Sequence, residues 1–411
     1  MIRSAVTLLV ALFPAVAGAA TLHVGATKPY ATISAAITAA AAGDTIVVHP
    51  GTYNEYVNIT KALTLASANG PSVTHLQRPS GTEVVRLAAS ATLYGLDIDG
   101  AGVMRGIRAE STATDVILQG VLIRNGLSDW GGGVEMLGES LTITGSRFED
   151  NEATNSGGGL YMSGASVARN VTINTTTFLR NTAASYGGGL LSDSPLTMTG
   201  CVVQDNTAGY GAGIHLDFAH GGDVQDTQFY GNVATSTGGA FFVNDTSSTF
   251  TLAHDLFVDN EAPTGGAVYV GGGGYPGSGN TLRVLASTFV SNWSDDGSHL
   301  KSGSSYLTAV MANDVFAYGE GAGPGVSLYN ATGARGYDLW FSNLGGDIVN
   351  ASRGTGSLTA DPRFVAWSDD GDPTNDDFSP GPGSPLVNHG HPAYQDADGT
   401  RSDIGWTGSV P

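Results

Sequence analysis

The chain has 411 residues, and 60 of them are glycine, about twice the ordinary share of ~7%. Its 17 basic and 37 acidic residues give a formal net charge of −20, which excludes the positive surface that nucleic acid or anionic lipid would need. Hydrophobic residues make up 41% of the sequence and Cys201 is the only cysteine. We therefore expect a folded chain that is stabilised by packing and hydrogen bonds, without internal disulfides.

Residues 1–20 have the pattern of a secretory signal peptide. Arg3 precedes an apolar run, and the small residues Ala17, Gly18 and Ala19 form a cleavage site. No later apolar stretch reaches the length that crosses a membrane. We predict an exported protein, secreted or at the cell surface, with no transmembrane segment.

Residues 21–43 are predicted to form a capping segment with one short helix. Four apolar residues share a helical face there: Ile33, Ala36, Ile37 and Ala40. Gly43 is placed to stop the helix. The stretch 30–59 resembles the start of many exported β-helix proteins, including pectin methylesterases, in which such a helix covers the open end of the coil.

Residues 44–360 are predicted to form the main coil, and from Leu122 to Asn343 they carry a repeat in which an apolar residue stands three positions before an asparagine. The pairs are Leu122/Asn125, Phe148/Asn151, Phe178/Asn181, Val203/Asn206, Phe229/Asn232, Phe257/Asn260, Phe289/Asn292 and Trp340/Asn343, with a weaker copy at Phe316/Gly319. From Asn125 to Asn292 the asparagines are separated by 25 to 32 residues. Short runs of β-branched residues at this period, with no helical periodicity, predict an all-β solenoid of the parallel β-helix type. Asparagines at one corner should stack in a ladder, and glycines should turn the chain.

The glycine motifs that follow the asparagines give the repeat a family resemblance. Gly-Gly-Gly or Gly-Gly-Ala paired with Phe-x-x-Asn, over about residues 120–345, resembles the repeat of chlamydial polymorphic outer-membrane proteins. These belong to the right-handed parallel β-helix class that also includes pectate lyases. The resemblance implies a right-handed parallel β-helix and, from the repeat, an adhesin-like function.

One outer face of the coil is predicted to carry the candidate site. Counted from the third residue of each glycine motif, positions one and three are apolar, so positions two and four should face solvent. The predicted ligand-binding residues are Glu135, Tyr161, Tyr186, Tyr210, Phe242 and Tyr269. The predicted catalytic residues are Asp193, His215 and Asp217, which adjacent turns would place about 5 Å apart, the carboxylate separation of a retaining glycosidase. The alternative for the same residues is a solvated sheet face with no ligand.

Three other motifs have weaker implications. The stretch 224–232 is similar to a pectin methylesterase motif, but Phe229 and Asn232 are ladder positions, so Gln225 and Asp226 are interpreted as structural. Asp97 and Asp99 share a strand face and form either a metal site or a polar exterior. Cys201 falls in a column of small residues and is interpreted as a corner residue.

Residues 361–411 are predicted to form an acidic cap over the last turn. Their Ser-Pro, Asp-x-Asp-Gly and Asp-Ile-Gly motifs resemble the closing segment of exported bacterial β-helix proteins. Two acidic clusters could bind Ca²⁺, the only cofactor that the sequence indicates: Asp396, Asp398 and Asp403, and separately Asp369, Asp370, Asp372, Asp376 and Asp377. Solvated acidic loops are the alternative.

Three functions remain open. We expect an exported scaffold that binds a glycan or a cell surface, because a regular coil offers a long ladder without a deep cleft. The alternatives are a polysaccharide lyase or glycoside hydrolase that acts on the outer face, and a structural envelope protein without a ligand. The sequence does not indicate an oligomeric state.

Overall fold

The computed structural model describes residues 18–164, 169–217, 221–244, 248–271, 279–304, 306–368, 370–372 and 375–408. The predicted signal peptide lies outside the described residues except for its last three positions, and Asp369 of the second acidic cluster also lies outside them. The described chain is a coil of short strands with one helix, α1 (Ile33–Ala39). None of its described helices is both long and apolar enough to cross a membrane.

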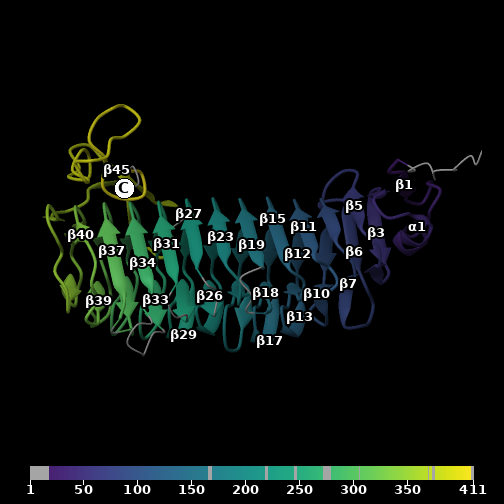
Figure 1. The fold of residues 1–411 in the computed structure, drawn as a ribbon, viewed down its shortest axis with the longest axis horizontal. Coiled ribbons are helices and arrows are strands. Elements are labelled where there is room, and N and C mark those ends of the chain that lie inside the picture. The colour runs from purple at the N-terminus through teal and green to yellow at the C-terminus, as the bar shows by residue number, and fades with distance from the viewer. Residues whose placement is uncertain are drawn as a thin grey trace, which may run out of the picture.

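Three long sheets run the length of the coil, and the strands within each pair in parallel (Figure 1). Sheet A contains β1 (Thr21–Val24), β2 (Thr45–Val48), β5 (Leu63–Ser67), β8 (Ala91–Tyr94), β11 (Asp115–Gln119), β15 (Ser140–Thr144), β19 (Asn170–Asn174), β23 (Leu196–Thr199), β27 (Gly222–Gln225), β31 (Thr249–Ala253), β34 (Thr281–Leu285), β37 (Thr308–Ala312) and β40 (Arg335–Gly336). Sheet B contains β3 (Gly51–Asn54), β6 (Thr74–Gln77), β9 (Asp97–Asp99), β12 (Leu122–Arg124), β16 (Arg147–Glu149), β20 (Thr177–Leu179), β24 (Val202–Gln204), β28 (Gln228–Tyr230), β32 (Leu256–Val258), β35 (Thr288–Val290), β38 (Val315–Ala317), β41 (Leu339–Phe341) and β43 (Leu358–Thr359). Sheet C contains β4 (Val57–Ile59), β7 (Glu83–Leu87), β10 (Arg105–Ala109), β14 (Val134–Met136), β18 (Leu160–Met162), β22 (Leu190–Ser192), β26 (Ile214–Asp217), β30 (Phe241–Asn244), β33 (Val268–Gly271), β36 (Leu300–Ser302), β39 (Val326–Leu328) and β42 (Ile348–Val349).

These sheets make a parallel β-helix of about 12 turns, as the repeat predicts. A fourth sheet, sheet D, is short and lies at the corner between sheets B and C. It contains β13 (Leu127–Trp130), β17 (Glu152–Ser156), β21 (Thr182–Ala183), β25 (Thr207–Tyr210) and β29 (Val233–Thr237). Two strands near the C-terminus, β44 (Phe364–Ala366) and β45 (Asp377–Pro380), pair with each other in antiparallel orientation.

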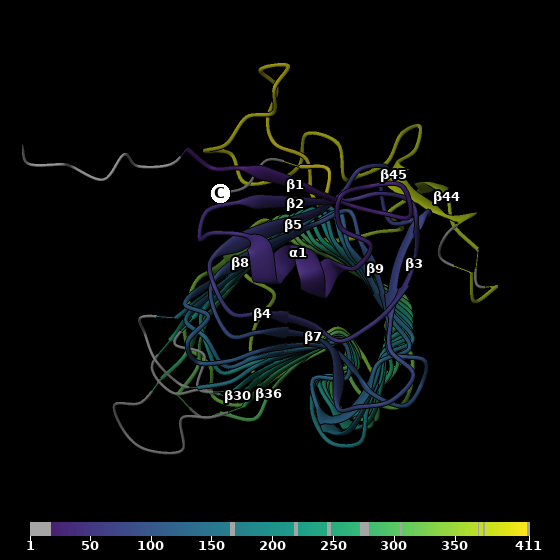
Figure 2. The ribbon, with the colours of Figure 1, turned by 90° about the vertical axis from the view of Figure 1, so that its right-hand side faces the viewer.

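The single helix covers the N-terminal end of the coil (Figure 2). It begins after Thr32, whose hydroxyl accepts a hydrogen bond from the Ala35 N–H at 3.2 Å, and so caps the helix. Ile33, Ala36 and Ile37 are buried against the first turn. The predicted capping helix is therefore confirmed, although it ends before Gly43.

The asparagine ladder is present as a single file inside the corner between sheets B and D. The Asn151 side-chain amide donates to the Asn181 side-chain oxygen at 2.9 Å, and the same contact continues through Asn206, Asn232, Asn260 and Asn292 at 2.9 to 3.0 Å. Each rung also accepts a hydrogen bond from a backbone N–H of the preceding turn. These contacts satisfy buried polar groups that water does not reach.

The weaker repeat at Gly319 shows how the chain fills a missing rung. His299 lies between the two flanking asparagines, with Nδ1 at 3.2 Å from Asn292 Nδ2 and Nε2 at 2.9 Å from Asn343 Oδ1. Burial lowers the pKa of His299 to about 4, so the ring is neutral. Because Gly319 has no side chain, the imidazole completes the file of hydrogen bonds.

A second polar column lies inside the corner between sheets A and B. A side-chain oxygen or sulfur of each residue accepts a hydrogen bond from the N–H of the residue one turn before it. The column consists of Ser146, Thr176, Cys201, Thr227, Asp255, Ser287, Asp314, Asp338 and Ser357. Cys201 is thus the corner residue that its column predicts, and burial raises the pKa of its thiol to about 11.

The glycines of the repeat are required by close backbone contact between turns. Gly187 has φ +61°, a left-handed conformation that glycine adopts without a steric penalty. A side-chain carbon at Gly158 would lie 2.4 Å from the carbonyl oxygens of both Gly188 and Thr182. The Gly-Gly pairs therefore turn the chain and let neighbouring turns approach.

The C-terminal segment, which is predicted to cover the last turn, packs against the last strands of sheet B and also against several earlier ones. It packs along the outer face of sheet B, where Phe378, Leu386 and Ile404 are buried. Their partners are outward-facing apolar residues of successive strands: Leu256, Val258, Val290, Val315, Ala317 and Leu339. Earlier turns carry several polar residues at these positions, such as Arg147 and Glu149, whereas the later turns carry an apolar run that the segment covers.

Candidate functional site

The outer face of sheet C carries the predicted position-two side chains in one straight column. The residues that pair from strand to strand are Asn58, Arg86, Arg108, Glu135, Tyr161, Leu191, His215, Phe242, Tyr269 and Lys301. The predicted register is therefore confirmed. The column divides into a charged part at the N-terminal turns and a largely aromatic part that follows.

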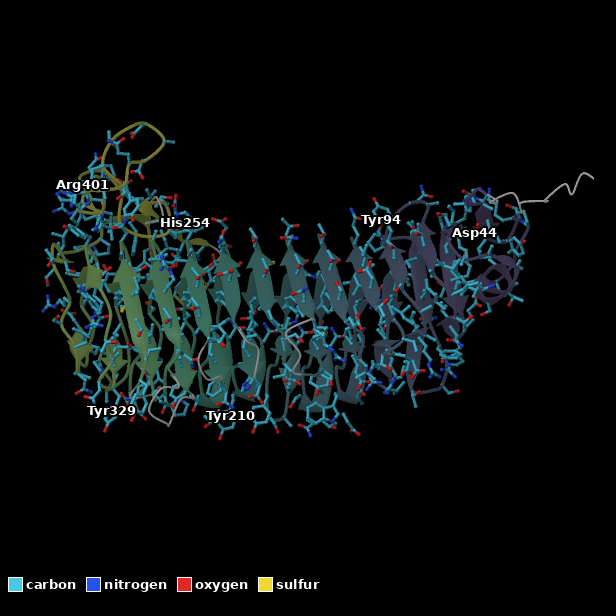
Figure 3. The ribbon with its side chains drawn as sticks, in the orientation of Figure 1. Asp44, Tyr94, Tyr210, His254, Tyr329 and Arg401 are labelled. Carbon is cyan, nitrogen blue, oxygen red and sulfur yellow. The ribbon has the colours of Figure 1, made fainter. Side chains whose placement is uncertain are left out.

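Aromatic rings lie along this part of sheet C in two contacting groups, with Leu191 of the column between Tyr161 and His215. Tyr210 lies at the lower edge in Figure 3. We define the aromatic row as Trp130, Tyr161, Tyr186, Tyr210, His215, Phe242 and Tyr269. Ring centroids are 4.9 Å apart for Trp130–Tyr161 and Tyr186–His215, 5.3 Å for Tyr186–Tyr210, 4.6 Å for His215–Phe242 and 5.1 Å for Phe242–Tyr269. Contacts at these distances are favourable for aromatic pairs.

The row differs in one respect from the sequence prediction, which places position two in solvent. His215 and Phe242 are only 2% and 8% exposed, because Tyr186 and Tyr210 from the corner with sheet D lie against them. The exposed rings are instead Tyr186, at 41%, and Tyr210, at 37%. The sequence prediction placed Tyr186 and Tyr210 on the same flat face as His215 and Phe242, so it did not foresee that the two tyrosines cover the other two rings.

The three predicted catalytic residues lie on adjacent turns but differ in accessibility. Burial lowers the pKa of His215 to about 3, and its Nδ1 is buried without a hydrogen-bond partner in the described chain. Asp217 accepts a hydrogen bond from Asn244 Nδ2 at 2.9 Å, and Asp193 accepts one from the Gly164 N–H at 3.2 Å. Burial also raises the pKa of Asp193. The catalytic role of this trio stays a prediction.

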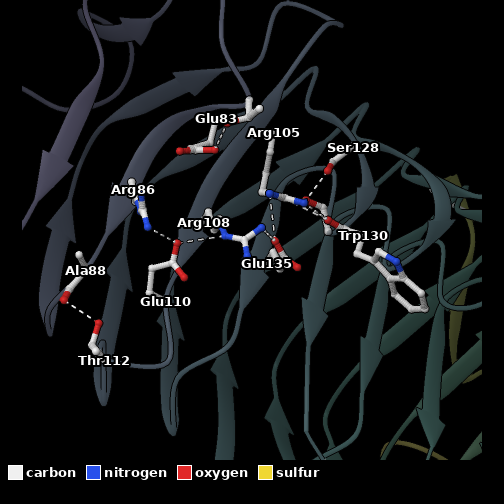
Figure 4. Close-up of polar contacts among 12 residues, drawn as sticks. Glu83, Arg86, Ala88, Arg105, Arg108, Glu110, Thr112, Ser128, Trp130 and Glu135 are labelled. Atoms are coloured by element: carbon white, nitrogen blue, oxygen red, sulfur yellow. Dashed lines mark hydrogen bonds and ion pairs between the residues drawn. The ribbon is translucent and has the colours of Figure 1, made fainter.

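A charged cleft of about 680 Å³ opens where sheet D begins, next to the aromatic row. Its lining includes Arg86, Arg105, Arg108, Glu83, Glu110 and Asp129. Figure 4 shows how the charges alternate: Glu110 lies between Arg86 and Arg108, at 2.9 and 3.1 Å, and Glu135 lies between Arg108 and Arg105, at 2.8 and 3.0 Å. Each carboxylate thus contacts two guanidinium groups.

Arg105 connects this charged cleft to the aromatic row. Its guanidinium donates to the Trp130 carbonyl oxygen at 2.9 Å and to the Ser128 hydroxyl at 2.5 Å. Burial lowers the pKa of Arg105, and the charge of Glu135 opposes that effect. Burial raises the pKa of Tyr161, with smaller contributions from the charges of Asp193 and Glu135. The cleft and the row are therefore two parts of one surface.

Comparison with known proteins agrees with this architecture. A family model described as a right handed beta helix region matches residues 105–283. The crystal structure of pectate lyase Pel9A is similar over 94% of this chain and 96% of that chain, with a TM-score of 0.52 and 16% identity. The protein is a right-handed parallel β-helix.

A second solved structure, the Agl-KA catalytic domain, has a TM-score of 0.51 and 12% identity. The match covers 77% of this chain and 63% of that one. No curated protein matches the chain. At these identities the similarity establishes the β-helix fold alone.

Glu135 does not line the charged cleft itself but forms ion pairs with two arginines that do, Arg105 and Arg108. Glu135 was predicted, but Arg86, Arg105 and Arg108 were not, because their turns precede the regular glycine repeat. The signal in the sequence is the spacing itself: Arg86 and Arg108 occupy position two of their turns of the β-helix. Extending the register toward the N-terminus places Arg108 beside Glu135 and Arg86 beside Arg108.

The predicted metal ligands Asp396, Asp398 and Asp403 accept hydrogen bonds from other residues of the C-terminal segment. Asp398 accepts hydrogen bonds from Thr400, Asp396 accepts one from the Asp403 N–H at 3.0 Å, and Asp403 accepts one from the Asn388 N–H at 2.7 Å. Among the described residues, no group of three or more His, Cys, Asp or Glu side chains is placed to hold a metal ion.

The remaining acidic candidates also have partners within the protein. Asp370 accepts hydrogen bonds from the Asp372 N–H and from Asn375, and Asp376 accepts one from Ser368. On the outer face of sheet B, Arg124 contacts both Asp97, at 2.9 Å, and Asp99, at 3.0 Å. Of the two interpretations of Asp97 and Asp99, this ion-paired arrangement favours the polar exterior.

Proposed function

We propose that the protein binds an extended polysaccharide along the outer face of sheet C. The aromatic row, with its two exposed tyrosines, is the observation that carries this proposal. Flat rings pack against the faces of sugar rings, and adjacent turns of a β-helix repeat at about 4.8 Å, close to the length of one sugar unit in an extended chain. A linear glycan parallel to the coil axis would contact successive turns.

The charged cleft adds a means of recognising polar and acidic groups of the same polymer. Arginine pairs with carboxylates in a bidentate geometry, and Arg86 and Arg108 are partly exposed beside the aromatic row. The predicted export fits the binding of a polysaccharide outside the cell. Binding of this kind serves attachment to a glycan or to a cell surface.

The test removes the two exposed rings together. The double variant Tyr186→Ala/Tyr210→Ala should bind its polysaccharide at least tenfold more weakly, a loss of about 1.4 kcal/mol, in affinity electrophoresis against neutral and acidic polysaccharides. The matched control is Tyr94→Ala/Tyr329→Ala, which removes two tyrosines that are 46% and 52% exposed elsewhere. Equal retention of the two double variants would contradict the proposal.

A second candidate function is cleavage of the bound polymer in the charged cleft. The observation that favours it is the convergence of guanidinium groups and carboxylates at Arg105, Arg108 and Glu135, in a fold similar to that of a pectate lyase. Product formation from acidic polysaccharides should then be lost in Glu135→Gln. Absence of product with every polymer that the wild type binds would leave binding as the function.

A further inference from the structure

A second pocket lies between the C-terminal segment and the outer face of sheet A. Its volume is about 260 Å³. Strands β34, β37 and β40 provide one wall, and the tail residues His391 and Tyr394 provide the other. Figure 3 places Arg401 of the tail on the upper edge of the molecule and Tyr210 of the aromatic row on the lower edge. This pocket is therefore separate from the polysaccharide surface proposed above.

The charge of the pocket is opposite to that of the protein as a whole. Arg283 and Arg335 line it, and none of its lining residues is acidic, although the chain carries a net charge of −20. Arg283 stands at an outward-facing position of β34, since its neighbours Leu282 and Val284 point into the core. Within the described chain, the guanidinium group of Arg283 has no hydrogen bond and no ion pair.

Arg335 also has unused hydrogen-bonding capacity. Its Nε donates to the Ser352 carbonyl oxygen at 3.3 Å, but its Nη1 is buried without a partner among the described residues. Buried donors of a charged group are costly to leave unpaired, and most are satisfied in native proteins. A pair of under-used guanidinium groups in one pocket indicates an anionic ligand.

The walls of the pocket indicate what carries the negative charge. Tyr337 packs edge-on against His391 at 4.8 Å, and the His391 ring lies 5.1 Å from Tyr394. Leu285, Val310 and Ala312 add apolar surface. Such a mixed lining suits a ring with a polar rim, and the volume exceeds what an inorganic anion requires.

The tail residues that complete the pocket are held in place by hydrogen bonds to the coil. The His391 N–H donates to Asn313 Oδ1 at 2.6 Å, and Asn313 Nδ2 donates to the Ser402 hydroxyl at 3.2 Å. The pocket is thus built before a ligand arrives, which reduces the entropic cost of binding.

We propose that this pocket binds a carboxylate-bearing sugar ring, either a free acidic monosaccharide or the acidic end of an oligosaccharide, with Arg283 pairing with the carboxylate. Titration calorimetry with D-galacturonate should show saturable binding with a dissociation constant on the order of 1 mM, typical of a ligand of this size. Galactose, which lacks the carboxylate, should bind at least tenfold more weakly. A galacturonate disaccharide distinguishes the two sources, since equal or tighter binding indicates a chain end and weaker binding a free monosaccharide.

Substitutions of Arg283 test whether galacturonate binds in this pocket. Arg283→Ala should weaken galacturonate binding at least tenfold, and Arg283→Lys should retain part of it because the charge remains. The matched control is Arg147→Ala, which removes an exposed arginine from the outer face of sheet B. Unchanged binding by Arg283→Ala, equal binding of galactose, or equal competition by inorganic phosphate would overturn the proposal. Retention of polysaccharide by the aromatic row is measured separately, so failure of one proposal leaves the other intact.

Discussion

Replacing Asp314 and Asp338 by asparagine should make the protein increasingly more stable than the wild type as the pH rises. Both carboxyl groups are fully buried in the inner column, where the Asp314 N–H donates to Asp338 Oδ1 at 3.1 Å. The Oδ2 atoms of both residues, and of Asp255 in the same column, lack a hydrogen-bond partner in the described chain. Burial raises the pKa of Asp314 and Asp338 well above the usual range, and the proximity of Asp338 adds to the effect on Asp314.

The direction of the pH effect follows from the raised pKa values. Because each group binds its proton more tightly in the folded state, its contribution to stability is fully present below the unfolded pKa of about 3.9. That contribution is lost as the pH rises through the folded pKa, at about 1.4 kcal/mol for each unit of pKa difference. Buried His215 and His299 have the opposite effect, because burial lowers their pKa values. As the pH falls, protons bind these histidines more readily in the unfolded state, and the folded state becomes less stable.

The quantity to measure is therefore the difference in thermal unfolding midpoint between the variant and the wild type. Thermal unfolding midpoints of Asp314→Asn/Asp338→Asn and of the wild type should be compared at intervals from pH 4 to pH 9. The control is Asp115→Asn, which removes an exposed carboxylate from the outer face of sheet A. A difference that stays constant over this pH range, as expected for the control, would contradict the proposed protonation of the buried pair.

The sequence predicts the repeating part of this fold well because the repeat expresses a physical constraint. Asn151 and Asn181 recur at one corner since their amides bond to each other, and that contact requires one residue per turn in the same register. The alternation of core and surface follows from the same register, so the outward column with Tyr161 and Phe242 was also predictable.

What the sequence analysis missed depends on contacts between parts that the repeat does not relate. The burial of His215 results from Tyr186, which belongs to the neighbouring corner and not to the same strand. The position of the tail depends on Val290 and Leu339, whose apolar character on an outward face was visible but was not connected with residues after 361. His299 replaces an asparagine rung from a different sequence position, so the motif at Gly319 looked merely degraded.

The asparagine ladder itself should be the most sensitive element of the fold. In Asn206→Ala the Asn181 N–H loses its acceptor, which lies at 2.9 Å, and the Phe178 carbonyl oxygen loses its donor, which lies at 3.0 Å. A buried group left unpaired costs about 1–3 kcal/mol, and the lost side-chain volume adds a cavity. We expect Asn206→Ala to lower the free energy of unfolding by about 3–5 kcal/mol in urea titrations.

The control for this change is another asparagine of the same chain. Asn244 also donates through its amide, to Asp217 at 2.9 Å, but it is exposed at the end of β30, where water replaces the lost contact. Asn244→Ala should therefore change the free energy of unfolding by no more than about 0.5 kcal/mol. If Asn206→Ala and Asn244→Ala lowered the free energy of unfolding by similar amounts, burial would not increase the contribution of the ladder hydrogen bonds to stability. The large difference expected here follows from the enclosed corner, in which Asn206 has no exposed surface and the unpaired groups of its neighbours cannot reach solvent.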